Sequence, residues 1–306
     1  MSQHAIKGSN KVSNDNAIII SNKIMKLLKD ELSINSCVLG STGKKKSNQY
    51  SGDIDIAIEY ELTDEHINNL KNVINNNLTV DSEHIIPFTL NQGLKILSFG
   101  YYYTPNLFNE YDLVQVDLMF SNDLEYSKFM YHSPNYIKNE SNFKGLYRTN
   151  LLCQIASCIP TGIPEIKDEN DNVTDFWKYT LTFDRGLKLT HKTYKGKTKL
   201  LKNPVTVKED NKFITSDINE IIKIVLGDNA TIEDTNSFET LINYIFSDKF
   251  KYSSILQNIY FDFIKDSRHT DIKQKLNEYI FNVLINSFKD KNFIYEQLIE
   301  MILTLN

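Results

Sequence analysis

Two aspartates stand one residue apart in a stretch that otherwise resembles an apolar β-strand. In SGDIDIAIEY, Asp53 and Asp55 alternate with Ile54 and Ile56. Successive side chains of a strand point to opposite faces, so both carboxylates share one face and the isoleucines face the core. Two carboxylates this close repel each other unless a cation neutralises them. The spacing therefore predicts a site for a hard cation such as Mg²⁺, which takes carboxylate and phosphate oxygens as ligands.

A third acid interrupts another apolar run. In LVQVDLMF, Asp117 shares a strand face with Gln115. If this strand lies beside residues 53–60, three carboxylates meet at one point. Such a cluster can hold two metal ions, which clamp the attacking and leaving oxygens of an in-line phosphoryl displacement. We therefore expect Asp53, Asp55 and Asp117 to be catalytic and to bind two Mg²⁺ or Mn²⁺ ions.

The segment before the aspartate pair, GSTGKKKS, offers groups that suit phosphate. Gly40 lets the backbone approach an anion closely and aim N–H groups at it, and Ser41 adds a hydroxyl. Lys44, Lys45 and Lys46 supply positive charge for a triphosphate. The other interpretation of the three lysines is a charged surface loop, and the sequence leaves both open.

This combination resembles the DNA polymerase beta-like nucleotidyltransferase superfamily. The pattern of that superfamily is a strand, Gly followed by Gly or Ser, a short helix or turn, and then Gly or Ser with Asp-x-Asp on the next strand. GSTGKKKSNQYSGDID contains each of these elements, with a slightly longer loop. The segments YHSPNYI and FKGLYRTN resemble, more loosely, parts of phage-encoded proteins of the same superfamily. The resemblance covers residues 17–122.

The resemblance implies a minimal mixed five-stranded sheet and a role for each matched residue. Asp53, Asp55 and Asp117 would be the metal ligands, and Asp117 would be the base, or the carboxylate that orients the base, for an acceptor hydroxyl. Gly40 and Ser41 would contact the nucleotide phosphates. Arg148, in FKGLYR, is a further candidate for nucleotide binding, although the same segment also suits ordinary helix and loop packing.

The patterns around the acids predict the architecture. Helical spacing over residues 17–32 and 63–77, the latter with Thr63 as N-cap, flanks several strand-like runs. The expected fold is α+β, with a mixed sheet and helices followed by a mostly helical C-terminal domain. The predicted division is a nucleotidyltransferase core over 1–125, a helical and basic connecting region over 126–205, and a helical domain over 206–306.

A basic stretch lies near the middle of the chain. Between Arg185 and Lys202 basic residues recur and no acid occurs. Because the formal net charge of the chain is −5, a polyanion must meet a local patch of this kind. The stretch is either a solvated hairpin or a phosphate track for a nucleic acid, with Trp177 and Tyr194 as stacking surfaces. The candidate nucleic-acid-binding residues are Arg185, Lys188, Lys192, Lys195, Lys197 and Lys199.

Other classes of protein match the sequence poorly. The three cysteines lack CxxC spacing, which predicts reduced thiols of a cytoplasmic protein and not a zinc site. No apolar run approaches the roughly 20 residues of a membrane span, so no membrane association is expected. GSTGKKKS resembles a P-loop only superficially because its glycines are too close together, and no GxSxG or HExxH motif occurs.

The residues together predict a metal-dependent nucleotidyltransferase that binds ATP or another nucleoside triphosphate. It would transfer a nucleoside monophosphate to a hydroxyl acceptor, expected to be a DNA or RNA end, and release pyrophosphate. One alternative is an oligonucleotide second-messenger synthase or a toxin-type transferase that modifies tRNA or protein. A second alternative is a non-catalytic protein that binds nucleotide or nucleic acid. The sequence does not indicate the acceptor, the base preference or the oligomeric state.

Overall fold

The structure is a computed structural model of the 306-residue chain. It describes residues 5–42, 44, 49–104, 111–137, 140–169, 173–183, 185–195, 205–265 and 273–287. The chain forms two compact units, Met1–Ser141 with Phe183–Arg185, and Asn142–Thr182 with Gly186–Asn306. The division into three parts drawn from the sequence stays a prediction. The first compact unit contains the predicted core and continues past residue 125.

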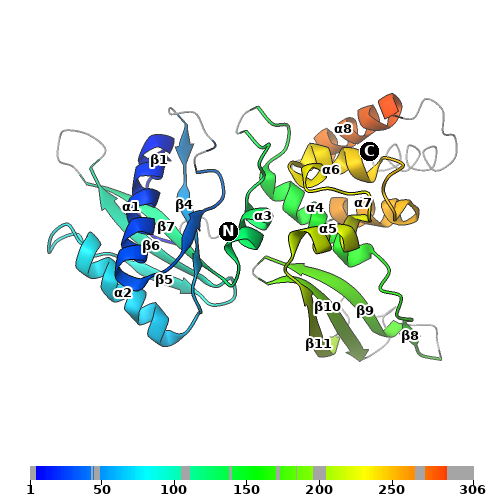
Figure 1. Cartoon of the computed structure of the whole chain (residues 1–306), viewed down its shortest axis with the longest axis horizontal. Helices are drawn as coiled ribbons and strands as arrows, with labels where there is room; N and C mark the ends of the chain where they lie inside the picture. Colours follow the sequence, from blue (N-terminus) through cyan, green and yellow to red (C-terminus); the bar gives the residue numbers. More distant parts are fainter. Residues whose placement is uncertain are drawn as a thin grey trace. The chain divides into compact units, whose positions relative to one another are not determined.

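The first unit is built on a mixed five-stranded sheet in the order β2-β4-β7-β6-β5 (Figure 1). Strands β4 and β7 are parallel neighbours, and the other neighbouring pairs are antiparallel. This sheet and its helices confirm the predicted α+β fold class. The strands are β2 (Ser36–Val38), β4 (Asp53–Glu59), β5 (Phe88–Asn91), β6 (Ile96–Tyr103) and β7 (Asp112–Ser121). A short ribbon of β1 (Val12–Ser13) and β3 (Tyr50–Ser51) accompanies them.

Helices α1 (Asn14–Leu32) and α2 (Asp64–Leu78) both lie over one face of this sheet (Figure 1). Their apolar stripes pack on the alternate, apolar side chains of the strands, so that Ile54, Ile56 and Ile58 are all 0% exposed. The α2 helix begins where the sequence predicts, because the side chain of Thr63 accepts a hydrogen bond from the backbone N–H of His66. The core therefore fixes which face of β4 carries the aspartates.

The opposite face of the sheet changes character along its length. At one end, Ala57 and Met119 pack in a small apolar cluster with Leu39 and Ile96. Side chains of helix α3 (Leu124–Tyr131) cover this cluster. At the other end the same face of β4 and β7 carries acids in place of apolar residues. The polar end is thus the part of this face that α3 leaves available for a ligand.

The second unit contains most of the remaining helices. They pack around a core that includes Ile155, Phe238 and Leu276. Gly227 ends helix α5 with φ of +105°, and its N–H donates to the carbonyl of Lys223. The helices are α4 (Gly145–Cys158), α5 (Ile218–Leu226), α6 (Phe238–Ile245), α7 (Leu256–Lys265) and α8 (Lys273–Ser287), with 3₁₀ turns η1 (Glu233–Thr235) and η2 (Ser253–Ile255).

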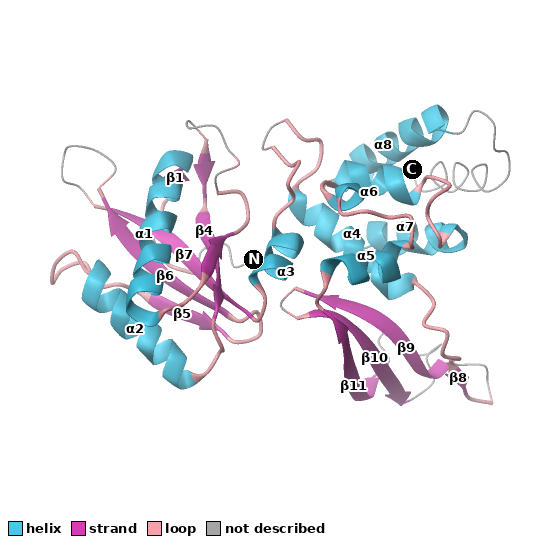
Figure 2. Ribbon diagram, viewed as in Figure 1, coloured by secondary structure: helices cyan, strands magenta, loops and turns pink. Residues whose placement is uncertain are grey.

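A second sheet of four antiparallel strands packs beside helix α4 in this unit (Figure 2). Its strands are β8 (Ile166–Lys167), β9 (Val173–Thr182), β10 (Gly186–Lys195) and β11 (Val205–Thr215). The predicted connecting region over 126–205 therefore contains β8, β9 and β10 as well as helices, and the predicted helical domain over 206–306 begins with most of β11. The sequence interpretation missed this sheet. Aromatic residues and threonines that alternate with lysine favour strands here, and Gly186, at φ of +103°, follows the turn between β9 and β10.

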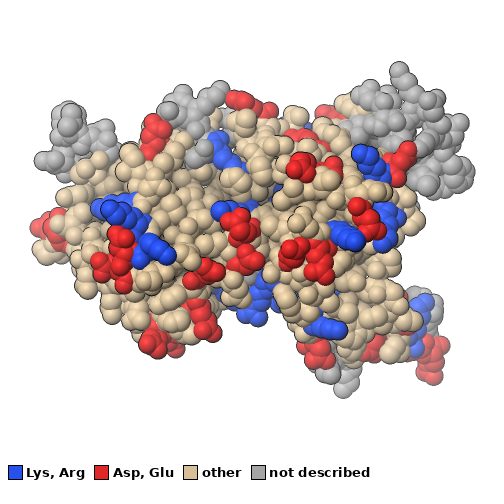
Figure 3. All heavy atoms as spheres, viewed as in Figure 1, with Lys and Arg blue, Asp and Glu red and all other residues tan. Residues whose placement is uncertain are grey.

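Among the described residues, none of the helices has the length and apolar character that crossing a bilayer requires. On the face shown in Figure 3, basic and acidic side chains of the described residues are interspersed. Any basic surface for a polyanion is therefore local, as the net charge of −5 requires.

Candidate metal centre

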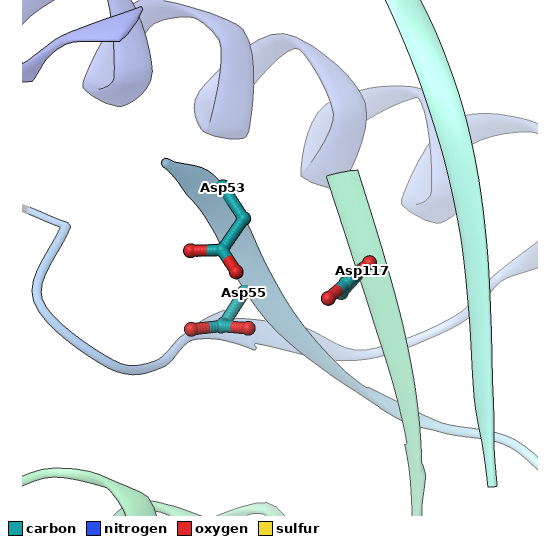
Figure 4. Close-up of side chains that lie close together, drawn as sticks. All are labelled: Asp53, Asp55 and Asp117. Carbon is teal, nitrogen blue, oxygen red and sulfur yellow. The ribbon is translucent and has the colours of Figure 1, made fainter. Parts of the chain in front are cut away.

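The parallel pairing of β4 and β7 brings the three predicted acids together. Asp55 stands directly opposite Asp117, and Asp53 stands opposite Gln115. One carboxylate oxygen from each of the three aspartates lies within 4.8 Å of the other two. Figure 4 shows Asp53 and Asp55 projecting from one strand next to Asp117 on its neighbour. The expectation that these three acids meet is confirmed.

Asp117 is the most enclosed of the three acids. It is 3% exposed, whereas Asp53 and Asp55 are partly exposed. The side-chain amide of Gln115 donates from Nε2 to both of its oxygens, at 3.0 and 3.2 Å, and Ser98 adds a hydrogen bond from β6. Burial raises the pKa of Asp117, and the charge of Asp53 acts in the same direction, against the hydrogen bonds from Ser98 and Gln115. A nearby cation would therefore favour its ionised form.

The donor set fits a divalent cation of the hard class. All three candidate ligands are carboxylate oxygens, which Mg²⁺, Mn²⁺ and Ca²⁺ prefer over nitrogen or sulfur. They come from a rigid pair of strands and not from a loop. The paired strands keep the Cα atoms of the three acids close together, so a bound cation relieves a repulsion that the backbone does not. The residues therefore suit the predicted metal.

The glycine turn after β2 lies against this cluster. Gly40 has φ of +62°, and a Cβ placed on it would lie 2.5 Å from Oδ2 of Asp55. The N–H of the preceding Leu39 donates to the backbone carbonyl of Asp55 at 2.9 Å. A side chain at position 40 would therefore strain the backbone and collide with the carboxylate. Gly40 and Ser41 lie next to the acids, where the sequence expects a phosphate contact.

The four basic residues that the sequence predicts to bind nucleotide differ in their surroundings. Nζ of Lys44 donates to the backbone carbonyl of Ser133, in the segment after α3. Lys45 and Lys46 lie outside the described residues. Arg148 lies in α4 of the second unit and is 1% exposed, with its Nε donating to the carbonyl of Thr235. Such burial favours a structural role for Arg148 and counts against the predicted phosphate contact.

The basic stretch occupies β10, where its charge is partly compensated. Nζ of Lys192 lies 3.0 Å from Oε2 of Glu209, which the pairing of β10 with β11 places opposite it. The same register sets Asp210 opposite His191. The stretch has no acid of its own, but β11 adds two. Arg185 is exposed in the turn before β10, and Lys188 is partly exposed on the strand.

The structure gives less support to the remaining candidate nucleic-acid-binding and stacking residues of this region. Lys195 ends β10, and Lys197 and Lys199 lie outside the described residues. Trp177, a predicted stacking surface, already stacks on His191 with ring centroids 4.5 Å apart. His191 in turn lies 3.0 Å from Asp175. Nucleic-acid binding by this sheet stays a prediction.

Two residues of the site escaped the sequence interpretation. The sequence places Gln115 on the face of Asp117 without indicating a role for it, although a polar residue two positions from an acid in an apolar strand is a usable signal. Ser98 is 2% exposed and stands opposite Asp117 in the pairing of β6 with β7. Nothing in the local sequence of β6 distinguishes this serine, because its place depends on strand register alone.

Fold and site together define an α+β protein with a triad of carboxylates on neighbouring parallel strands. Comparisons with models of known protein families and with curated proteins find no match. Among solved structures, a ternary gap complex of Leishmania infantum polymerase beta is similar at 14% identity and a TM-score of 0.33, over 48% of this chain and 47% of that one. A ternary P/T complex of the same polymerase aligns at 11% identity and a TM-score of 0.39, over 74% and 77%. Both scores are low, so the function has to be inferred from the geometry of the site itself.

Proposed function

We propose that this chain is a metal-dependent nucleotidyltransferase that moves a nucleoside monophosphate from a nucleoside triphosphate to a hydroxyl acceptor. The observation that carries the proposal is the convergence of Asp53, Asp55 and Asp117, within 4.8 Å of one another, beside the Gly40 turn. Carboxylates that crowd together on adjacent strands contribute repulsion to the fold. Their arrangement is explained if a cation and a phosphate substrate bind there.

Each residue of the site has a proposed task in the reaction. Asp53 and Asp55 would hold both divalent ions, and Asp117 would hold the one at the acceptor. Asp117 also orients the acceptor hydroxyl and receives or passes on its proton. The acceptor oxygen forms a bond to the α-phosphorus, the bond from that phosphorus to the bridging oxygen breaks, and pyrophosphate leaves. Bound Mg²⁺ or Mn²⁺ would supply charge neutralisation for the attacking and leaving oxygens. The remainder is positioning, to which Gly40 and Ser41 contribute by binding phosphate.

A nucleic-acid end is the acceptor that we propose. Support comes from Arg185, which is exposed, and from Lys188, which is partly exposed on β10. The ion pair between Lys192 and Glu209 weakens this support because it removes one positive charge from the track. A second-messenger synthase, a transferase that modifies tRNA or protein, and a protein that only binds nucleotide would all use the same triad.

Product analysis separates these alternatives. The protein is incubated with each α-labelled nucleoside or deoxynucleoside triphosphate, with Mg²⁺ or Mn²⁺, and with DNA, RNA, tRNA, protein or no acceptor. Label on DNA or RNA ends supports the proposal, whereas a small oligonucleotide or labelled tRNA or protein points to the alternatives. Asp53→Asn should abolish the product, and Glu59→Gln, an exposed acid at the other end of β4, should not. Tight nucleotide binding without any product in every combination would refute transferase activity.

A further inference from the structure

The segment before α1 runs along β7 and reaches the candidate metal centre. The N–H of Asn10 donates to the carbonyl of Leu113 at 2.7 Å, and its side chain donates to Asp112. Four residues earlier, the N–H of Ile6 donates to Oε1 of Gln115 at 3.1 Å. The side chain of Ile6 is 1% exposed, so the segment is anchored by burial as well as by hydrogen bonds. Residues 5–13, the N-terminal segment, thus dock beside the strand that carries Asp117.

The docked segment determines which way the amide of Gln115 points. A backbone N–H can only donate, so the N–H of Ile6 requires the amide oxygen of Gln115 to face it. The amide nitrogen must then face the other way, and from there it donates to both oxygens of Asp117, at 3.0 and 3.2 Å. Gln115 is 1% exposed, so a flipped amide could not find water in place of these partners. It would also set its oxygen against the carboxylate.

Asp117 needs this kind of support because its carboxylate is otherwise weakly oriented. The terminal torsion of an aspartate is broad and roughly two-fold, so the strand alone does not fix the plane of the carboxylate. Hydrogen bonds from Gln115 and Ser98 occupy part of its acceptor capacity and restrict its rotation. One oxygen of the same carboxylate lies within 4.8 Å of an oxygen of Asp53 and of Asp55.

We propose that the N–H of Ile6 and the amide of Gln115 form a relay through which the docked N-terminal segment orients Asp117 for binding of a divalent cation. Gln115 is then a positioning residue of the metal centre, and Ile6 sets its orientation. The relay rests on the proposed function, because it assumes that the triad binds metal. Groups that hydrogen-bond to a metal ligand change metal affinity or activity by about 10- to 100-fold when they are removed.

Direct binding of Mn²⁺, measured by electron paramagnetic resonance without nucleotide, tests the relay on the full chain. Gln115→Met keeps the length of the side chain and removes the hydrogen bond from Ile6 and the two to Asp117. We expect this change to weaken Mn²⁺ binding by about tenfold or more. Ser121→Ala is the matched control, since Ser121 is buried on the same strand and bonds to Ser127 and Asp123, away from the acids. The control should lower Tm in EDTA without changing Mn²⁺ affinity.

A second pair of variants isolates the contribution of the N-terminal segment. Ile6→Pro removes the N–H that faces Gln115, whereas Ile6→Ala keeps the N–H and removes most of the buried side chain. The relay predicts weaker Mn²⁺ binding for Ile6→Pro than for Ile6→Ala. Equal losses in both would show that packing and not the hydrogen bond matters, and would overturn the relay. Unchanged affinity in Gln115→Met would overturn it as well.

The outcome for the wild-type protein distinguishes the two proposals. If the wild type binds Mn²⁺ and transfers nucleotide while Gln115→Met and Ile6→Pro behave like it, the relay fails and the proposed function stands. If the wild type neither binds Mn²⁺ nor transfers nucleotide under any of the conditions above, the proposed function fails and the relay fails with it.

Discussion

Asp55 and Asp117 stand directly opposite each other on two parallel strands that are distant in the sequence. Parallel neighbours keep their side chains in step, so the carboxylate of Asp55 meets that of Asp117, while Asp53 stands opposite Gln115. In the absence of a cation this arrangement is repulsive. The site therefore contributes to function at some expense of stability.

Removing one charge from the pair on β4 should separate activity from stability. Asp53→Asn and Asp55→Asn should each lower nucleotide transfer by at least about a hundredfold, which corresponds to about 2.7 kcal/mol of transition-state stabilisation. In EDTA their Tm should equal or exceed that of the wild type because repulsion is relieved. Mg²⁺ should raise the Tm of the wild type and leave the Tm of both variants unchanged. Transfer near the wild-type rate would show that the triad is not the catalytic site.

A methyl group at position 40 should weaken metal binding as well as strain the backbone. Gly40→Ala places an L-residue at φ of +62° and sets its Cβ 2.5 Å from Oδ2 of Asp55. Gly162→Ala is the matched control, because Gly162 has φ of +75° with nothing within 4 Å of the added Cβ. The control should cost only the backbone strain, about 1–2 kcal/mol of unfolding free energy.

The two glycine variants are compared by chemical denaturation and by Mn²⁺ binding. Gly40→Ala should lose more unfolding free energy than Gly162→Ala, and Mn²⁺ affinity should fall for Gly40→Ala alone. Equal behaviour of the two variants in both measurements would place the Gly40 turn away from the carboxylate of Asp55.

The unfolding free energy of the metal-free protein should depend on pH through Asp117. Burial raises the pKa of Asp117 above its ordinary value of 3.8, so the folded state binds this proton more tightly than the unfolded state. The contribution of protonated Asp117 to the unfolding free energy is therefore complete below pH 3.8, and it is lost as the pH rises through the raised pKa. Asp117→Asn has no such proton and should lack this pH dependence.

The measurement for Asp117 is the unfolding free energy of both proteins against pH in EDTA. Relative to Asp117→Asn, the wild type should lose stability as the pH rises through that window. Added Mg²⁺ should reduce the difference because the ion replaces the proton in neutralising the site. A wild type that gains stability relative to the variant over the same window would contradict the direction of the pKa shift.

The acids of β11 should limit nucleic-acid binding by β10. Lys192 holds the pKa of Glu209 below its ordinary value through their hydrogen bond, so Glu209 stays a carboxylate beside Lys192 at neutral pH. Glu209→Gln should free the charge of Lys192, raise the affinity for single-stranded DNA or RNA and steepen its dependence on salt. Fluorescence anisotropy at several salt concentrations measures both effects.

A surface pair elsewhere in the second unit provides the control for this experiment. Asp228 lies 3.4 Å from Lys223, and both side chains are well exposed. Asp228→Asn makes the same change in net charge and should alter nucleic-acid affinity less than Glu209→Gln does. Equal effects of the two substitutions would mean that net charge, and not the β10 track, governs binding.

The sequence alone determined the features that local periodicity encodes. Alternation over residues 53–60 placed Asp53 and Asp55 on one face, because a strand has a period of two whatever surrounds it. Thr63 predicted the start of α2, since a hydroxyl before a helical pattern satisfies a free N–H at its end. These signals depend on neighbours within a few residues of each other.

Only the tertiary structure decided which distant residues share the site. The register that sets Asp55 opposite Asp117, the hydrogen bond from Ser98, and the contact between Ile6 and Gln115 all join separate segments. The burial of Arg148 and the acids that β11 brings to β10 have the same origin. Local patterns specify faces and ends of elements. Partners are chosen by the packing of the whole sheet, whose energy is non-local and leaves no short motif in the chain.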